Sequence, residues 1–121
     1  MPTKINQVNS DNPTLQIPKG LSRKGRNAAM AILRVLQGKA IDGKIETGGC
    51  RLFYSPKEWK ERGEEYGTDA ALVVVYDGGD AYNFFSFNTE AVSYLDAMTE
   101  ALKAVGVHSE ACTGWYSAVY E

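Results

Sequence analysis

The chain has 121 residues, of which 44% are hydrophobic and 23% are charged, a composition typical of one globular domain with its own core. No apolar run approaches the roughly 20 residues that cross a bilayer. The polar N-terminal residues lack the apolar core of a secretion signal, so we expect a cytoplasmic protein without membrane contact. The two cysteines and single histidine exclude a multi-histidine metal site and a Cys-x-x-Cys motif. The sequence therefore predicts no metal and no cofactor.

The net charge of −2 conceals an uneven distribution of charge along the chain. Residues 1–51 carry nine basic and three acidic side chains, a net charge of +6. Residues 52–121 carry four basic and twelve acidic side chains, a net charge of −8. Such an asymmetry indicates a charged partner, or two faces with different roles.

Residues 1–19 are expected to form an extended arm ahead of a single α+β domain at residues 20–121. Prolines interrupt this polar stretch, and Leu15 and Ile17 predict a short edge strand at residues 14–17. A polar arm with spaced apolar residues can exchange onto a second copy, so a homodimer formed through the arm is one expectation.

The first helix is expected to follow the N-cap Ser22 and to run to Gln37, with Gly38 as its stop. Its apolar residues recur at helical spacing, at Ala29, Ile32, Leu33 and Leu36. Gly25 lies in the first turn and weakens the helix by about 1 kcal/mol relative to alanine.

Three strands are expected in the middle of the chain. A turn at residues 42–43 precedes a strand at residues 44–54, whose double glycine indicates a bulge. Residues 70–76 are apolar on both faces, which predicts a central strand. A tight turn at residues 77–80 would then lead into an antiparallel hairpin partner at residues 83–87.

A short helix is expected between the first two of these strands. Ser55 is predicted to be its N-cap, followed by proline, and Glu58 completes a capping box. The helix would run to about Tyr66, with Trp59 and Tyr66 facing inward and Gly67 closing it.

The last helix is expected to begin at Asn88 or Thr89 and to run to Val105, because apolar residues recur along it at helical spacing. A single final strand at residues 107–120, bulged at Gly114, would follow. The whole order predicts an α+β fold: a small antiparallel or mixed sheet of about four strands, with two long helices and one short helix packed on one face. The order of the strands is left open.

The basic start of the first helix is a candidate anion-binding site. Arg23, Lys24 and Arg26 lie where the helix dipole already presents positive charge. A phosphate or nucleic-acid group bound there, with Ser22 as a further donor, would offset this cost, and Gly25 would permit its close approach. A solvated basic turn and a salt bridge to an acidic surface are the alternatives.

Acidic and aromatic residues are the candidate partner-binding surfaces. Carboxylates gather in the short helix and after it, at Glu58, Glu61, Glu64, Glu65 and Asp69. They are either a solvated face or a surface that docks on a basic patch which normally holds nucleic acid. In the final strand, Trp115 is expected to face one way, and Tyr116 and Tyr120 the other. One face would pack on the last helix, and the other is either an open stacking or protein-binding patch or buried under the first helix or the arm.

Two further patterns have weaker functional interpretations. Asp77 and Asp80 flank a double glycine, which indicates a hairpin turn more than a cation site, because calcium needs more oxygen ligands and a longer loop. Cys50 with His108 would make a thiol nucleophile and its base, but neither their spacing nor a local signature supports this.

The segments FYSPKEWKERGEEYG (residues 53–67), LVVVYDGGD (72–80) and ACTGWYSAVY (111–120) resemble those of small uncharacterised proteins encoded by bacteriophages and related mobile elements. The helix start SRKGRNAA (22–29) is similar too, so the resemblance covers residues 20–120. It implies an accessory protein that binds a host or defence component, and it brings no catalytic residues.

Together these patterns predict a non-enzymatic binding protein that acts on a host protein, such as a defence or nucleic-acid-handling complex. The acidic and aromatic surfaces would contact that protein. The alternative prediction is a nucleic-acid or phosphate-binding protein that uses the basic start of the first helix, although a pI of 5.4 opposes strong non-specific DNA binding.

Overall fold

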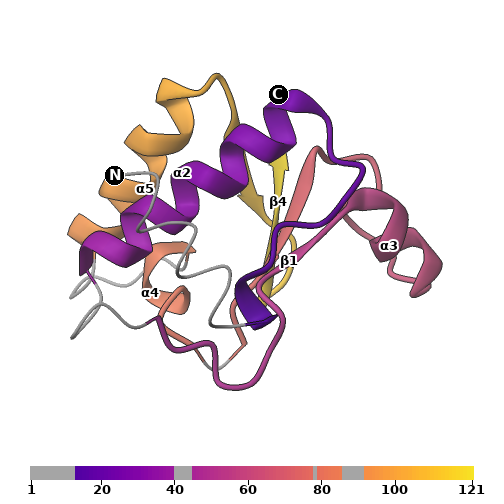
Figure 1. The fold of residues 1–121 in the computed structure, drawn as a ribbon, viewed down its shortest axis with the longest axis horizontal. Coiled ribbons are helices and arrows are strands. Elements are labelled where there is room, and N and C mark those ends of the chain that lie inside the picture. The colour runs from indigo at the N-terminus through magenta and orange to yellow at the C-terminus, as the bar shows by residue number, and fades with distance from the viewer. Residues whose placement is uncertain (1–12, 40–44, 78, 86–91) are drawn as a thin grey trace.

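The computed structural model describes residues 13–39, 45–77, 79–85 and 92–121. It confirms the predicted α+β class (Figure 1). The elements in chain order are the 3-10 turn η1 (Pro13–Leu15), α2 (Arg23–Lys39), β1 (Phe53–Tyr54), α3 (Pro56–Glu61), β2 (Leu72–Val75), α4 (Tyr82–Phe85), α5 (Val92–Ala104), β3 (His108–Ala111) and β4 (Tyr116–Tyr120). None of the helices in these ranges is long and apolar enough to cross a membrane.

The sheet is antiparallel throughout and has the strand order β1-β2-β4-β3. All four residues of β2 are buried, which confirms the prediction of a central strand covered on both faces. Since side chains alternate along a strand, Leu72 and Val74 face one side of the sheet, and Val73 and Val75 face the other.

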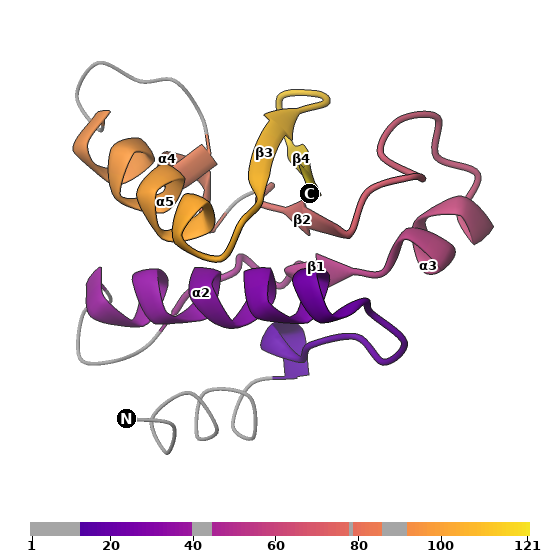
Figure 2. The ribbon, with the colours of Figure 1, turned by 90° about the horizontal axis from the view of Figure 1, so that it is seen from above.

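The larger core lies on the Leu72 and Val74 side of the sheet, against α2, α4 and α5. The apolar stripe of α2 is fully buried there, and Met98 and Leu102 of α5 pack against it. Figure 2 shows α2 and α5 side by side, with α3 apart from them. Burial of this stripe is the main force that holds the helices on the sheet.

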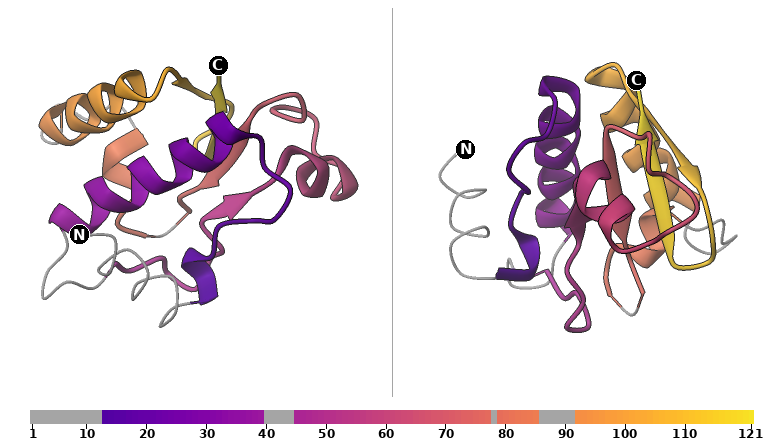
Figure 3. Two further views of the ribbon diagram at one scale, coloured as in Figure 1. Left: turned by 45° about the horizontal axis from the view of Figure 1, so that its top comes forward. Right: turned by 90° about the vertical axis from the view of Figure 1, so that its right-hand side faces the viewer.

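A smaller core lies on the opposite face, where Trp59 of α3 packs on Val73, Val75 and Tyr116. The left-hand view of Figure 3 shows α3 apart from the two long helices. The expectation that all helices cover one face is therefore wrong. The burial of Val73 and Val75 already required a cover on the second face, and Trp59 supplies it.

The C-terminal residues form a hairpin and not the predicted single strand. β3 and β4 pair antiparallel from His108 opposite Tyr120 to Ala111 opposite Ser117. The N–H groups of Cys112 and Thr113 both donate to the Tyr116 carbonyl and close the turn. The chain reverses at the position where the sequence suggested only a bulge.

The hairpin predicted between residues 70–76 and 83–87 is also wrong. Tyr82–Phe85 is the short helix α4, and β2 pairs with β1 and β4 instead. Phe84 and Phe85 are adjacent and both buried, which a strand with one exposed face does not permit.

Element ends differ from the predictions in several places. Residues 13–15 form a 3-10 turn and not an edge strand, and the strand expected at 44–54 contracts to β1 because Gly48 and Gly49 form a turn with positive φ. Helix α2 continues through Gly38 to Lys39, and Gly38 does not adopt the positive φ of a glycine that ends a helix. The predictions for residues 1–12, for the turn at 42–43 and for the cap of the last helix lie outside the described residues.

Candidate functional site

Helix α3 begins with the predicted capping box. Ser55 Oγ accepts from the Glu58 N–H at 3.1 Å, and Glu58 Oε1 accepts from the Ser55 N–H at 2.9 Å. Arg51 donates to the same carboxylate oxygen at 2.7 Å. Burial alone raises the pKa of Glu58, but the Ser55 hydrogen bonds and the Arg51 guanidinium outweigh it, so the pKa is lowered. Glu58 is thus an ionised group engaged within the protein.

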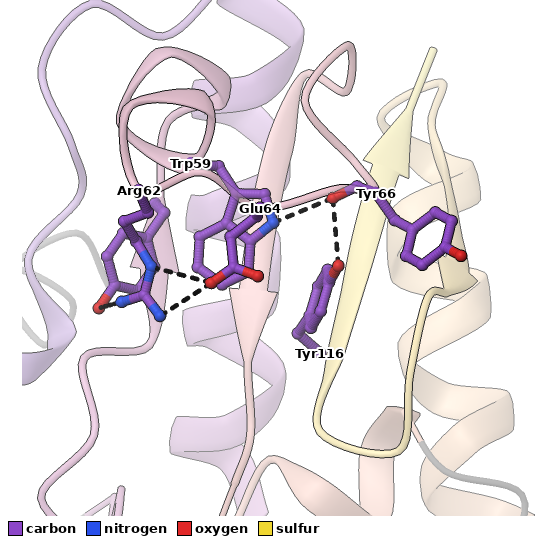
Figure 4. A network of polar contacts seen from close by, with 6 residues as sticks. Trp59, Arg62, Glu64, Tyr66 and Tyr116 are labelled. Carbon is purple, nitrogen blue, oxygen red and sulfur yellow. Dashed lines mark hydrogen bonds and ion pairs between the residues drawn. The ribbon is translucent and has the colours of Figure 1, made fainter.

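The loop after α3 is anchored through the carbonyl of Tyr66. The buried Trp59 donates its Nε1–H to that carbonyl at 3.0 Å, and the Tyr116 hydroxyl donates to it at 3.2 Å (Figure 4). The Tyr66 ring points away from this network (Figure 4) and is 53% exposed, so the inward placement predicted for it is wrong. Helix α3 ends at Glu61, five residues before Tyr66.

Arg62 connects the loop to the aromatic cluster around Trp59. Its guanidinium lies 4.7 Å from the centroid of the Trp59 ring and 5.1 Å from that of Tyr54. It also pairs with the Glu64 carboxylate at 3.0 Å. Of the four glutamates predicted to contact a partner, Glu58 and Glu64 are therefore paired within the protein, and Glu61 and Glu65 are exposed.

An open hollow of about 590 Å³ separates this loop from strand β3. Carboxylates from both sides line it: Glu65 and Asp69 from the loop, and Glu110 from β3. Tyr66 and Tyr120 supply aromatic surface, and no lysine or arginine is among its lining residues. We call Glu65, Asp69 and Glu110, with these two tyrosines, the acidic hollow.

A second hollow of about 410 Å³ adjoins the first and shares Asp69 and Tyr120 with it. It adds the carboxylate of Glu121, and again no basic side chain lines it. The Tyr120 hydroxyl donates to Asp69 Oδ1 at 3.5 Å, at the boundary between the two hollows. The two adjoining hollows thus share a lining that is acidic around the end of β4.

Two neutral groups in the acidic hollow, Cys112 and Tyr120, have raised pKa values. Burial raises the pKa of the Cys112 thiol, and the nearby carboxylates of Glu110 and Asp69 raise it further. Burial also raises the pKa of Tyr120, again with Asp69 and Glu110 contributing. Both groups therefore stay protonated at neutral pH, and the thiol is a poor nucleophile.

Sequence reasoning missed Glu110. Its side chain reaches the hollow only because the chain reverses between β3 and β4, and the sequence predicted one continuous strand there. Asp69 belongs to the acidic stretch that the sequence predicts as a binding surface, but its position opposite Glu110 depends on the same hairpin. A turn signal at Thr113 and Gly114 was the one local feature that could have indicated the reversal.

The predicted aromatic surface is only partly accessible. Tyr116 is 2% exposed and packs edge-on against Trp59, with ring centroids 4.8 Å apart. Trp115 lies on the same side, 5.9 Å from the Trp59 ring, so the two residues do not face opposite ways. Of the three aromatic residues predicted at the C-terminus, Tyr120 lines the acidic hollow, together with Tyr66 of the loop.

At the basic start of α2, the Ser22 Oγ accepts from the Gly25 N–H at 3.1 Å and caps the helix. A Cβ on Gly25 would overlap the Ala71 carbonyl, so the glycine serves close packing of α2 on the sheet. Arg23, Lys24 and Arg26 are exposed, and no ion pair joins them to another described residue. The Lys24 ammonium lies against Gly106, at the end of α5, where the helix dipole favours a cation.

The thiol and imidazole of the proposed Cys50–His108 pair lie at opposite ends of the sheet. The Cys50 thiol donates to the Asp77 carbonyl at 3.0 Å, just beyond the end of β2. His108 lies opposite Tyr120, beside the beginning of β2. This separation contradicts a nucleophile–base pair, and both cysteines are free thiols.

Gly79 and Asp80, which end the predicted turn, pack closely against the segment at Glu46. The Asp80 carboxylate accepts from the Glu46 N–H at 2.8 Å. A Cβ on Gly79 would lie 2.8 Å from the Glu46 carbonyl oxygen, so the glycine permits this close approach. Within the described ranges, no three His, Cys, Asp or Glu side chains form a group able to hold a metal.

Comparison of the chain with protein-family models, with curated proteins and with solved structures finds no match. The α+β fold by itself implies no activity, because small folds of this kind host many unrelated functions. Function is therefore inferred from the charges and exposed side chains of the acidic hollow.

Proposed function

We propose that this chain is a non-enzymatic binding protein, of the accessory type encoded by bacteriophages. It captures a host protein in the cytoplasm, from a defence or nucleic-acid-handling complex, by a basic surface of that protein. The observation that carries the proposal is the acidic hollow. Glu65, Asp69 and Glu110 come from two separate segments and line one open site that no lysine or arginine lines.

A basic protein surface is the natural complement of this site. Surfaces that bind nucleic acid are arrays of lysine and arginine, and complementary charge steers such a surface to the acidic hollow and selects against acidic partners. Tyr66 and Tyr120 add amphipathic rings of the kind that are enriched at protein interfaces. The raised pKa of Cys112 and that of Tyr120 favour binding over chemistry at this site.

The test is affinity capture from bacterial lysate with the immobilised protein, with and without nuclease. The variant Glu65→Lys/Glu110→Lys reverses two charges of the acidic hollow. Asp96→Lys/Glu100→Lys, at two exposed positions of α5, is the matched control, because it changes the net charge by the same amount. We expect the wild type and the control to retain the same protein with or without nuclease, and the double variant to lose it.

Glu61→Lys separates the acidic hollow from the rest of the predicted acidic surface. Glu61 is exposed at the end of α3 and does not line either hollow. Retention by Glu61→Lys together with loss by the double variant would place the contact in the hollow. Equal capture by the wild type and the double variant would refute the proposal.

A second candidate function is nucleic-acid or phosphate binding at the start of α2. It is favoured by the exposed cations Arg23, Lys24 and Arg26, which have no carboxylate partner among the described residues. It is opposed by the position of Ser22, which lines the second hollow beside Asp69 and Glu121. Those carboxylates repel an anion at Ser22.

The variant Arg23→Glu/Arg26→Glu tests this second function. Acidic residues stabilise the first turn of a helix, so a loss of binding in this variant would not come from unfolding. The measurement is fluorescence anisotropy of a labelled single-stranded oligonucleotide at several salt concentrations. Binding that weakens steeply with salt and is abolished in the variant supports the site, and no binding by the wild type refutes it.

A further inference from the structure

Strand β3 is one edge of the sheet, and one side of its backbone is not paired. The Cys112 N–H donates to the Tyr116 carbonyl, and hydrogen-bonded pairs alternate along an antiparallel ladder. The backbone groups of Glu110 and His108 therefore face β4, and those of Ser109 and Ala111 face outward. Among the described residues, nothing hydrogen-bonds to these outward groups.

The side chains of β3 place the acidic hollow directly beside this free edge. Glu110 lies opposite Ala118, and His108 lies opposite Tyr120, so their side chains share the face of the sheet that carries the hollow. Ser109 and Ala111 turn their small side chains to the other face. The edge thus offers unpaired backbone on one side and, on the face above it, the Glu110 carboxylate at the rim of the hollow, with the His108 Nε2 3.0 Å from it.

We propose that a basic, extended segment of the protein partner adds to β3 as an antiparallel fifth strand. Its lysine or arginine residues, at alternate positions, would lie over Glu110 and reach into the acidic hollow. This inference rests on the proposed function and specifies how the partner is held. Main-chain hydrogen bonds to Ser109 and Ala111 provide affinity, and the acidic face provides specificity for a cationic strand.

The geometry fixes which partner residue carries the charge. A residue directly opposite Glu110 on an added strand has its Cβ about 5 Å from that of Glu110, on the same face. Opposite charges at such a position attract, and like charges repel. The partner residue opposite Glu110 is therefore lysine or arginine, and the residues before and after it point to the other face.

A second copy of this chain fits the edge less well. The register that uses all the outward groups of both copies pairs Ser109 of one with Ala111 of the other. That register sets the two Glu110 carboxylates directly opposite each other, which is unfavourable. A basic strand forms the same hydrogen bonds without this repulsion.

The test uses a fluorescein-labelled synthetic peptide about seven residues long, in which lysine alternates with valine. One control peptide carries glutamate in place of lysine. Another keeps the lysines but has methyl groups on the backbone amides that would pair with β3. Anisotropy measures the affinity, and amide exchange by NMR measures the protection of Ser109 and Ala111.

Two variants of the protein complete the design. Glu110→Lys reverses the central charge. Ser109→Pro removes an outward N–H and leaves the ladder with β4 intact, because proline is tolerated on an edge strand. Circular dichroism shows whether each variant is folded, and the methylated peptide, which needs only the wild-type protein, keeps the test decisive if Ser109→Pro does not fold.

We expect the lysine peptide to bind and to slow amide exchange at Ser109 and Ala111. The methylated peptide, and the lysine peptide on Glu110→Lys, should each bind about tenfold more weakly, or about 1.4 kcal/mol. Equal binding of the methylated peptide would overturn strand addition and leave the acidic hollow as a charge-only site. A wild-type dimer joined through β3, detected by sedimentation and lost in Ser109→Pro, would show a second copy at the edge and also overturn it.

Failure of this inference is distinguishable from failure of the proposed function. If no lysine peptide binds but the lysate partner is still lost in Glu65→Lys/Glu110→Lys, the acidic hollow binds a folded surface and strand addition is wrong. If the partner is retained by that double variant, the proposed function is wrong as well.

Discussion

Replacement by alanine is predicted to have opposite effects on stability at the two glycines of helix α2, Gly25 and Gly38. In an exposed helix position, glycine to alanine stabilises by roughly 0.5 to 1 kcal/mol, because alanine loses less conformational entropy on folding. Gly38 is exposed, and an added Cβ would meet nothing within 4 Å. Gly38→Ala should therefore stabilise the protein by about that amount, which is a rise in Tm of about 2 to 4 °C for a domain of this size.

Gly25→Ala should destabilise the protein although it adds the same methyl group to the same helix. The new Cβ would overlap the backbone carbonyl of Ala71, which neither a rotamer change nor a flexible side chain relieves. Helix α2 must shift away from the start of β2, and forced overpacking of this kind costs about 1 to 3 kcal/mol. The shift would also strain the hydrogen bond from the Gly25 N–H to Ser22.

Urea denaturation followed by circular dichroism measures both effects. The expected result is a higher midpoint for Gly38→Ala and a lower midpoint for Gly25→Ala, with unchanged slopes. If Gly25→Ala raised the midpoint as Gly38→Ala does, the close contact between α2 and Ala71 would not exist, and the packing of α2 on the sheet would need revision.

Three further predictions concern buried contacts and pH. Ser117→Ala leaves the buried Tyr76 hydroxyl without its 2.8 Å hydrogen-bond partner and should lower the free energy of unfolding by about 1 to 3 kcal/mol. Adding Tyr76→Phe should recover part of that stability. Fully additive costs of the two substitutions in a double-mutant cycle would contradict the contact. Trp59→Phe removes the hydrogen bond to the Tyr66 carbonyl and should lower stability by about 1 to 3 kcal/mol. Amide exchange in the loop after α3 should also become faster. Unchanged exchange there would show that Trp59 does not anchor the loop. Because the folded pKa of Glu58 is lowered, its ionised form stabilises the protein above the unfolded pKa of about 4.3. Glu58→Gln should therefore cost about 0.5 kcal/mol at pH 7, and the difference from wild type should vanish as the pH falls through the folded pKa; a pH-independent difference in chemical denaturation would refute this.

The local elements of the fold follow from short-range patterns that can be recognised in the sequence. The capping box at Ser55 and Glu58 needs only neighbours three residues apart, and the burial of β2 follows from four consecutive apolar residues. The apolar stripe of α2 likewise identified the helix and its buried side. These features, and the α+β class that they add up to, were determined by the sequence alone, because each depends on interactions within one turn or one strand.

Pairing between distant segments was decided only by the tertiary structure. No local pattern gives the register of β2 against β4, and the sequence therefore predicts one strand where β3 and β4 form a hairpin, and a strand where α4 forms a helix. The face of the sheet that α3 covers depends on the packing of Trp59 against residues of β2 and β4. No local sequence pattern predicts that contact. The same holds for the acidic hollow. Glu110 and Asp69, which are 41 positions apart in the chain, line one site only because the β3–β4 turn places the edge strand opposite the loop after α3. Charge can be counted along a sequence, but its concentration at one site arises when long-range strand pairing brings separated carboxylates together.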